Sequence, residues 1–168
     1  MKGKWAAGIP PRHLTWIMDG RLAASERPGG YSATHRKVRR QEEIIWLREN
    51  GFTCVISIMP ADTNIPAYTE LGVRSLNIAL PREGSHEAAL LAIFEELDRQ
   101  LREGGKVLIH DDDLGDRTMA VIGGFLIHTG KMPELPIAVT VVERLFSRQL
   151  GTDGRAIMAE TLNETKQA

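Results

Sequence analysis

The order of its sequence patterns predicts that this chain folds as a three-layer α/β domain with a mostly parallel sheet. Short apolar runs rich in β-branched residues alternate with longer segments that repeat apolar residues at helical spacing. Glycine and proline residues separate the two kinds of segment. No internal repeat or low-complexity linker divides the 168 residues, so we expect one domain over residues 1–168.

Five short segments are predicted strands, which gives a sheet of four or five strands. They are residues 14–17, 21–25, 53–59, 73–80 and 106–110. The clearest is the run TCVISIM at residues 53–59, which is apolar and β-branched and lies between Gly51 and Pro60. A strand of this composition is buried on both faces, so we expect helices on both sides of the sheet.

Six segments show helical features and alternate with or follow the strands. They are residues 34–49, residues 64–71, the stretch between Ser85 and Gly104, and residues 118–129, 136–149 and 155–166. Ser85 is the expected N-cap of the third helix. Residues 118–129 are apolar nearly all round, which predicts a buried helix, and Gly123 and Gly124 inside it predict close packing.

The predicted functional site is the strand, loop and helix at residues 106–129. In parallel α/β sheets, ligands bind beyond the carboxyl ends of the strands. The loop at residues 111–116 follows such an end and is polar, with the sequence DDDLGD. We therefore expect the functional residues of the chain to gather around this loop.

The stretch KVLIHDDDLGDRTMAVIGGFL, residues 106–126, resembles the core of the cysteine-dependent tyrosine and dual-specificity phosphatases. In that family a strand ending in His is followed by Cys, five residues, Arg, and then Ser or Thr. His110, Arg117 and Thr118 stand at these positions with the family's spacing. Flanking segments extend the resemblance over residues 14–150. It implies a twisted, phosphatase-like sheet with helices on both faces.

The loop departs from the family at the position that carries the chemistry. Asp111 stands where the family has its nucleophilic cysteine. Leu114 and Asp116 stand where glycines are frequent, with Gly115 between them. Several departures together disfavour a single deliberate replacement at position 111. The resemblance therefore implies a phosphatase-fold protein that lacks cysteine-dependent phosphatase activity.

The expected general-acid loop also departs from the family. Residues 81–86, PREGSH, contain no Asp, so Glu83 and His86 are the nearest substitutes. The single cysteine of the chain, Cys54, lies in the middle of a predicted strand and is expected to be a core thiol. It is not expected to replace the missing nucleophile.

The charge of the loop predicts weak binding of oxyanions. Residues 111–117 carry four Asp and one Arg, a formal charge of −3. Two unit charges 4 Å apart interact by about 4 kcal/mol at an effective dielectric constant of 20, so a phosphate dianion would meet several such repulsions. A cation suits the loop better.

Three functional interpretations remain open, and none decides whether the chain is an enzyme. In the first, the pocket is repurposed for ligand binding or Asp-based chemistry on a cationic or polar small molecule. In the second, the chain is a non-catalytic pseudophosphatase that binds or regulates a partner protein. In the third, Asp111 is the nucleophile of a phosphoester hydrolase. The candidate catalytic residues are Asp111, Asp113, Asp116 and Arg117, and the candidate ligand-binding residues are His110, Asp112, Gly115, Thr118, Glu83 and His86.

No cofactor is expected, but a divalent metal held by Asp111 and Asp113 stays an alternative. The loop does not match the calcium-hand pattern, because the sixth position from Asp111 is Asp116 and the twelfth is Ile122.

Structural interpretations compete with these functional ones. Asp113 or Asp116 could cap the following helix, and Arg117 could pair with Asp111 or Asp113 and hold the loop closed. His110 is expected to order the loop by hydrogen bonds. Two further sets of residues are expected on the surface: His86 and His128, and a basic run at residues 36–40 that forms a solvated helix face.

Composition bounds the partners. With 21 basic and 22 acidic residues the formal net charge is −1, which argues against binding to nucleic acid. No apolar run approaches the roughly 20 residues needed to span a bilayer, so no membrane partner is expected. We expect a cytoplasmic protein, since the one cysteine excludes an internal disulfide. The oligomeric state is left open.

Overall fold

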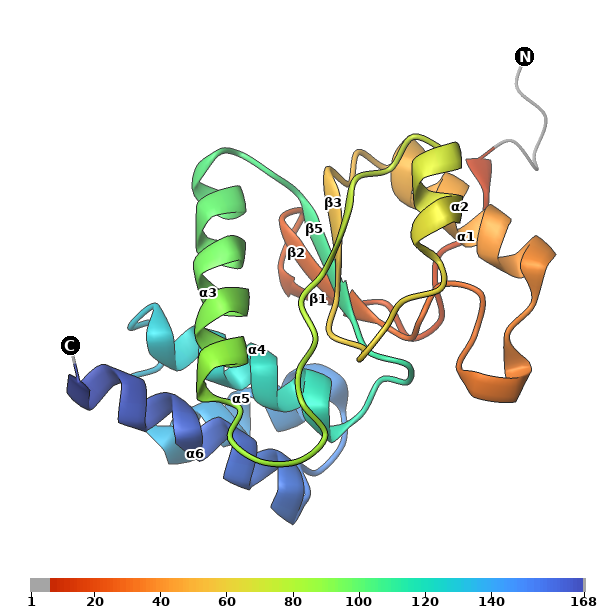
Figure 1. Cartoon of the computed structure of the whole chain (residues 1–168). Coiled ribbons are helices and arrows are strands. Elements are labelled where there is room, and N and C mark those ends of the chain that lie inside the picture. The colour runs from red at the N-terminus through yellow and green to blue at the C-terminus, as the bar shows by residue number, and fades with distance from the viewer. Residues whose placement is uncertain (1–6, 168) are drawn as a thin grey trace.

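The computed structural model describes residues 7–167, so residues 1–6 and 168 of the predicted domain lie outside it. Five strands form one sheet in the order β1-β2-β5-β3-β4 (Figure 1). The strands are β1 (Thr15–Met18), β2 (Leu22–Ser25), β3 (Cys54–Ser57), β4 (Ser75–Asn77) and β5 (Val107–His110). Only the β1–β2 pair is antiparallel within this sheet. The predicted α/β class and mostly parallel sheet are confirmed.

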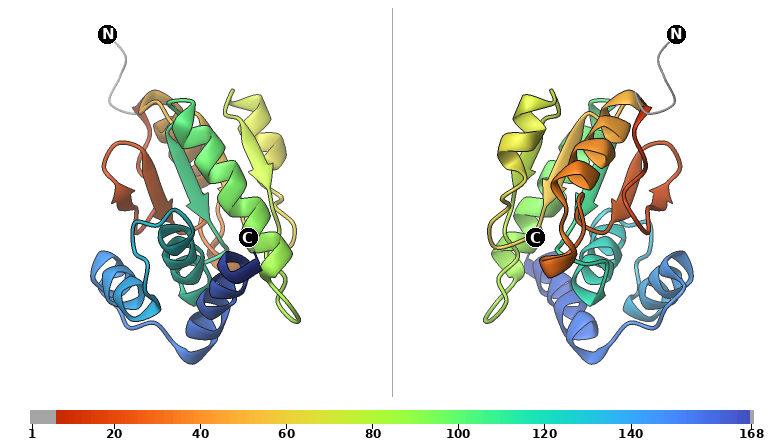
Figure 2. Two further views of the ribbon diagram at one scale, coloured as in Figure 1. Left: turned by 90° about the vertical axis from the view of Figure 1, so that its left-hand side faces the viewer. Right: turned by 90° about the vertical axis from the view of Figure 1, so that its right-hand side faces the viewer.

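Helices cover both faces of the sheet, as predicted. They are α1 (Lys37–Glu49), α2 (Ile65–Glu70), α3 (Glu87–Arg102), α4 (Asp116–His128), α5 (Leu135–Phe146) and α6 (Thr152–Gln167). Helices α1 and α2 pack on one face, and α3 to α6 gather on the other (Figures 1 and 2). A short 3-10 helix, η2 (Ser32–Thr34), precedes α1.

Side chains of the central strand β5 alternate between the two cores. Val107 and Ile109 belong to the larger apolar cluster with α3 to α6, while Leu108 belongs to the cluster under α1 and α2. All three are fully buried. Because β5 lies between β2 and β3, its carboxyl end and the loop after it are fixed from both sides.

Helix α4 is buried as the sequence predicts, and its glycines are needed for the packing. A Cβ atom at Gly123 would collide with Met158 of α6. A Cβ at Gly124 would lie 2.6 Å from Thr161 Oγ1 and 2.8 Å from the Phe94 ring. The pair therefore lets α6 approach the backbone of α4.

Some predicted element ends are wrong by a few residues. Helix α1 begins at Lys37, because residues 32–34 form η2. Strand β4 covers only three residues. Ser85 is not the N-cap of α3: His86 holds that position, while Ser85 Oγ accepts only a long 3.4 Å hydrogen bond from the Glu87 N–H.

Cys54 lies fully buried in β3, where burial raises the pKa of its thiol, so the prediction of a core thiol is confirmed. In the part of the chain that the structure describes, no helix is both long and apolar enough to cross a bilayer.

Candidate functional site

The candidate site is the loop at residues 111–115, between the carboxyl end of β5 and the start of α4. Gly115 is the N-cap of α4, with extended backbone at φ −140° and ψ −159°, and no side chain caps the helix. The prediction that Asp113 or Asp116 caps α4 is therefore wrong. Arg117 projects from the first turn of α4 back to the loop.

Arg117 is held by three acceptors within the protein. Its Nε donates to Asp111 Oδ2 at 2.8 Å. Its terminal nitrogens donate to the backbone oxygens of Leu80 at 2.6 Å and Pro81 at 3.1 Å. The Asp111 side chain is only 6% exposed, so the pair is shielded from water. Of the two pairings that the sequence left open, the structure contains the one with Asp111.

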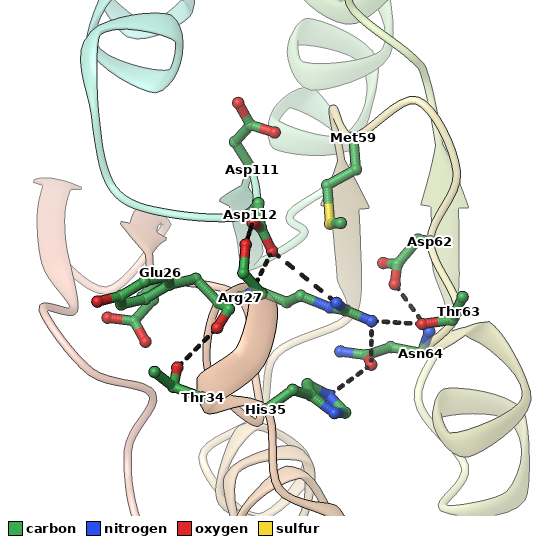
Figure 3. Close-up of polar contacts among 12 residues, drawn as sticks. Glu26, Arg27, Thr34, His35, Met59, Asp62, Thr63, Asn64, Asp111 and Asp112 are labelled. Carbon is green, nitrogen blue, oxygen red and sulfur yellow. Dashed lines mark hydrogen bonds and ion pairs between the residues drawn. The ribbon is translucent and has the colours of Figure 1, made fainter.

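Asp112 joins the loop to the segment between β2 and α1. Its carboxylate accepts from the Ser32 backbone N–H at 3.1 Å and from the Ser32 hydroxyl at 2.7 Å. Arg27 donates its backbone N–H to the Asp112 carbonyl oxygen at 3.2 Å, and its guanidinium lies 3.9 Å from the carboxylate (Figure 3). The same guanidinium bonds to Thr63 and Asn64. Sequence reasoning missed Arg27 and Ser32, because only the fold brings them to residue 112.

Asp116 faces away from the loop, toward the connection between α5 and α6. Its carboxylate accepts from the Gly151 backbone N–H at 3.1 Å and pairs with Arg148 at 3.3 Å. Among the side chains described for residues 7–163, that of Asp113 has no ion pair or hydrogen bond. The four carboxylates of the loop therefore do not converge on a common binding point.

The fold changes the electrostatics that the sequence suggested. Arg27 and Arg148, remote in sequence, stand beside Asp112 and Asp116. Including them reduces the local formal charge from −3 to −1. Among the described residues, no group of three or more His, Cys, Asp or Glu side chains is placed to hold a metal ion. A metal on Asp111 would also have to compete with Arg117.

His110 orders the loop from inside the protein. It is fully buried, and its Nδ1–H donates to the Asp111 carbonyl oxygen at 2.8 Å. Its Nε2 lies 3.3 Å from the Tyr68 hydroxyl and 3.4 Å from Asp62 Oδ2. Burial alone would raise the pKa of Asp62, but the nearby His110 ring and the Asn64 backbone N–H, which donates to Asp62 Oδ1 at 2.8 Å, outweigh burial and lower that pKa.

Two polar atoms of the loop region are buried without a hydrogen-bond partner. They are Asp111 Oδ1 and Thr118 Oγ1. Each costs free energy relative to a paired group, because a buried polar atom loses its bonds to water. The positions that the resemblance assigns to the nucleophile and to its assisting hydroxyl are thus occupied by groups that are sealed from solvent.

The predicted general-acid loop is built differently from the expectation. Glu83 is exposed. The prediction that His86 is a surface residue is wrong: its side chain is 12% exposed, and Nδ1 lies 2.6 Å from Glu160 Oε2 of α6. Glu160 Oε1 also accepts the His86 backbone N–H at 3.0 Å. His128 is half-buried and lies against the Phe94 ring, with centroids 5.2 Å apart.

The predicted solvated face at residues 36–40 is wrong in part. Arg39 is 13% exposed and bonds to Glu43 at 2.6 Å and to Glu26 at 3.1 Å. Glu43 also accepts the Gly29 backbone N–H at 2.6 Å. Burial raises the pKa of Glu43 in spite of these bonds. Part of the basic run therefore belongs to a buried ionic network beside the segment that holds Asp112.

No protein-family model matches this chain, and no curated protein sequence matches it. Solved structures share its fold. Kinase-associated phosphatase, with its catalytic-site cysteine replaced by serine, superposes with a TM-score of 0.78 at 18% identity over 94% of this chain and 98% of that chain. Tk-PTP in its active form superposes with a TM-score of 0.67 at 23% sequence identity, over 92% of this chain and 97% of that chain. Human tyrosine phosphatase-like serine/threonine/tyrosine-interacting protein superposes with a TM-score of 0.67 at 18% sequence identity, over 92% of this chain and 96% of that chain.

The chain therefore has the fold of the tyrosine and dual-specificity phosphatases. At these identities the comparisons establish the fold, and the chemistry must be argued from the loop itself.

Proposed function

We propose that this protein is a phosphatase-fold binding module that lacks cysteine-dependent phosphatase activity. The observation that carries the proposal is the internal pairing of Arg117 with Asp111 and with two backbone carbonyls. In the family that the loop resembles, this arginine holds the phosphoryl group. Here its bonds are made within the protein.

The absence of a usable thiolate supports the same conclusion. Cysteine phosphatases need a low-pKa thiolate at the loop. The cysteine of this chain, Cys54, lies in the core, where burial raises the pKa of its thiol. Asp111 occupies the nucleophile's position, with one carboxylate oxygen bonded to Arg117.

An oxyanion would have to displace a carboxylate to bind at Arg117. The Asp111–Arg117 bond joins two charged groups that are 6% and 20% exposed, so it is stronger than a pair in open water. A phosphate would also meet the negative charge of Asp111 after displacing it. This arrangement favours a loop closed to phosphate esters.

The second candidate is a phosphoester hydrolase with Asp111 as nucleophile. One observation favours it: Asp111 Oδ1 has no hydrogen-bond partner, so its lone pairs are not engaged within the protein. The same oxygen is buried, and the side chain would have to move before it reached a substrate. A cationic ligand is supported by Asp113, the loop acid whose side chain has no partner among the side chains of residues 7–163.

A binding role also accords with one structural neighbour. The human protein with a TM-score of 0.67 is named as phosphatase-like and as an interacting protein. Its name describes that protein, and at 18% identity it supports a role for the fold without fixing a partner for this chain.

The activity is tested with para-nitrophenyl phosphate and a fluorogenic aryl phosphate. We expect the wild type to give no turnover above buffer and Asp111→Asn to give the same background. Asp113→Asn is the matched control, because it makes the same change at an acid that does not pair with Arg117. Wild-type turnover that disappears in Asp111→Asn but persists in Asp113→Asn would contradict the proposal and establish the aspartate nucleophile.

A further inference from the structure

A cavity lies between the loop of residues 81–86 and helix α6, beside the closed loop at residues 111–115. Figure 1 shows the connection between β4 and α3 running past α6. The cavity has a volume of about 520 Å³, and its wall includes Arg117 but no residue of the 111–115 loop. Small-molecule sites fall in the range of about 300–1,000 Å³. The lining residues are Arg82, Gly84, His86, Arg117, Asp153, Ala156, Ile157 and Glu160.

The loop over this cavity is fixed at both ends. At its start, Arg117 donates to the backbone oxygens of Leu80 and Pro81. At its end, the Glu160 carboxylate accepts hydrogen bonds from both the backbone N–H and the ring Nδ1–H of His86. A site with fixed walls loses little entropy when it binds a ligand, which is the condition for useful affinity in a small pocket.

One face of α6 forms the opposite wall. Asp153, Ala156, Ile157 and Glu160 follow one another at the spacing of residues on a single helix face. Ile157 is 6% exposed and packs into the core, so its side of the cavity is apolar and rigid. The wall thus offers an acid at one end, a short apolar stretch, and Glu160 at the other end.

The charges of the cavity divide into paired and unpaired groups. Glu160 pairs with His86, and Arg117 pairs with Asp111. Arg82 and Asp153 are exposed, and among the side chains of residues 7–163 neither takes part in an ion pair or hydrogen bond. The free charged groups of the lining are therefore one cation and one anion, carried by opposite walls, and the uncharged free group is the buried His86 Nε2.

We propose that this cavity binds a small zwitterion, such as a free amino acid or a short peptide. The carboxylate of the ligand bonds to the Arg82 guanidinium, which suits planar carboxylates. The ammonium group bonds to the Asp153 carboxylate. A short apolar side chain lies against Ala156 and Ile157. A ligand with only one charge leaves either Arg82 or Asp153 without a partner, so it binds more weakly.

The proposal does not depend on the proposed function, because Arg82 and Asp153, which carry it, take no part in the Asp111–Arg117 pairing. Arg117 touches both the cavity and the closed loop, since its Nε binds Asp111 while its terminal nitrogens hold the start of the 81–86 loop. A ligand under this loop therefore contacts the residue that closes the phosphatase-like loop.

The probes that test it are leucine, 4-methylpentanoate and isoamylamine, which share a branched carbon skeleton and differ in charge. Leucine carries both charges, and the other two carry one each. Binding is measured by thermal shift and by isothermal titration calorimetry on the full chain. At a concentration about 100 times its Kd, leucine is expected to raise the Tm by about 5 °C, with a smaller shift for either singly charged probe.

Variants then locate the site. Arg82→Gln and Asp153→Asn are each expected to weaken leucine binding by about tenfold or more, because each removes one charge-assisted bond. Glu95→Gln and Arg102→Gln are the matched controls, since they change exposed charges that do not line the cavity. They should leave the affinity unchanged.

Three results would overturn the proposal. One is that neither leucine nor any of a panel of amino acids and dipeptides binds the protein at about 10 mM. Another is equal binding by 4-methylpentanoate, which would mean a plain anion site. The third is leucine binding that survives both Arg82→Gln and Asp153→Asn.

Discussion

Arg39 is expected to be the most sensitive charged residue of the fold outside the loop. Its guanidinium bonds to two carboxylates, Glu43 at 2.6 Å and Glu26 at 3.1 Å, whose side chains are 1% and 5% exposed. Replacing Arg39 with Met keeps much of the side-chain volume and removes the cation. Two buried acids then lose their partner, which costs about 3–4 kcal/mol of unfolding free energy.

The loss is large compared with the total stability of a domain of this size, about 5–15 kcal/mol. It corresponds to a decrease in Tm of about 10 °C. Urea unfolding followed by circular dichroism gives the free energy directly. Arg39 lowers the pKa of Glu43, so its removal lets burial raise that pKa further. Protonation of Glu43 then stabilises the variant more than the wild type, so the loss in Arg39→Met should be smaller at pH 5 than at pH 8.

The matched control is Arg102→Met. Arg102 pairs with Asp98 at 2.9 Å, a distance similar to those of Arg39, but its side chain is 79% exposed. An exposed pair of this kind contributes less than about 1 kcal/mol. If Arg39→Met and Arg102→Met cost the same, burial of the carboxylates does not determine the stability of this network and the reasoning is wrong.

Two further predictions concern the packing of α4 and the support of His110. Gly124→Ala should destabilise the fold by about 1–3 kcal/mol in urea unfolding, because the new methyl group meets Phe94 and Thr161. The control Gly104→Asn places a side chain in open space at a left-handed backbone position, so it should cost less than about 1 kcal/mol. Because the pKa of Asp62 is lowered in the folded state, its contribution to stability is present above its unfolded-state pKa of about 4 and is lost as the pH falls through the folded-state value. Urea titrations from pH 7 to pH 2 should therefore show the difference between wild type and Asp62→Asn shrinking in acid, and a constant difference would refute the assignment.

The sequence predicted the parts of the fold that local patterns determine. The apolar runs around Cys54 and at residues 107–110 are buried strands, and the apolar segment after Arg117 is a buried helix with glycines at its contact with α6. These features depend on residues that are neighbours in sequence. The resemblance at His110, Arg117 and Thr118 predicted the phosphatase fold, which the solved structures confirm.

The sequence did not predict the partners of the charged residues. Asp112 bonds to Ser32, 80 residues away, and His86 bonds to Glu160, 74 residues away. Only the packing of helices and loops brings such groups together, and no local pattern marks them. For the same reason the loop was expected to carry an excess of charge that Arg27 and Arg148 largely neutralise.

The central claim is that Asp111 closes the loop by occupying Arg117, and tungstate binding tests it most directly. Isothermal titration calorimetry on wild type, Asp111→Ala and Asp113→Ala separates the release of Arg117 from the removal of a negative charge alone. The account predicts no measurable binding to wild type or Asp113→Ala, and binding to Asp111→Ala that disappears in Asp111→Ala/Arg117→Ala. Tungstate binding to the wild type that is as tight as to Asp111→Ala would contradict the account.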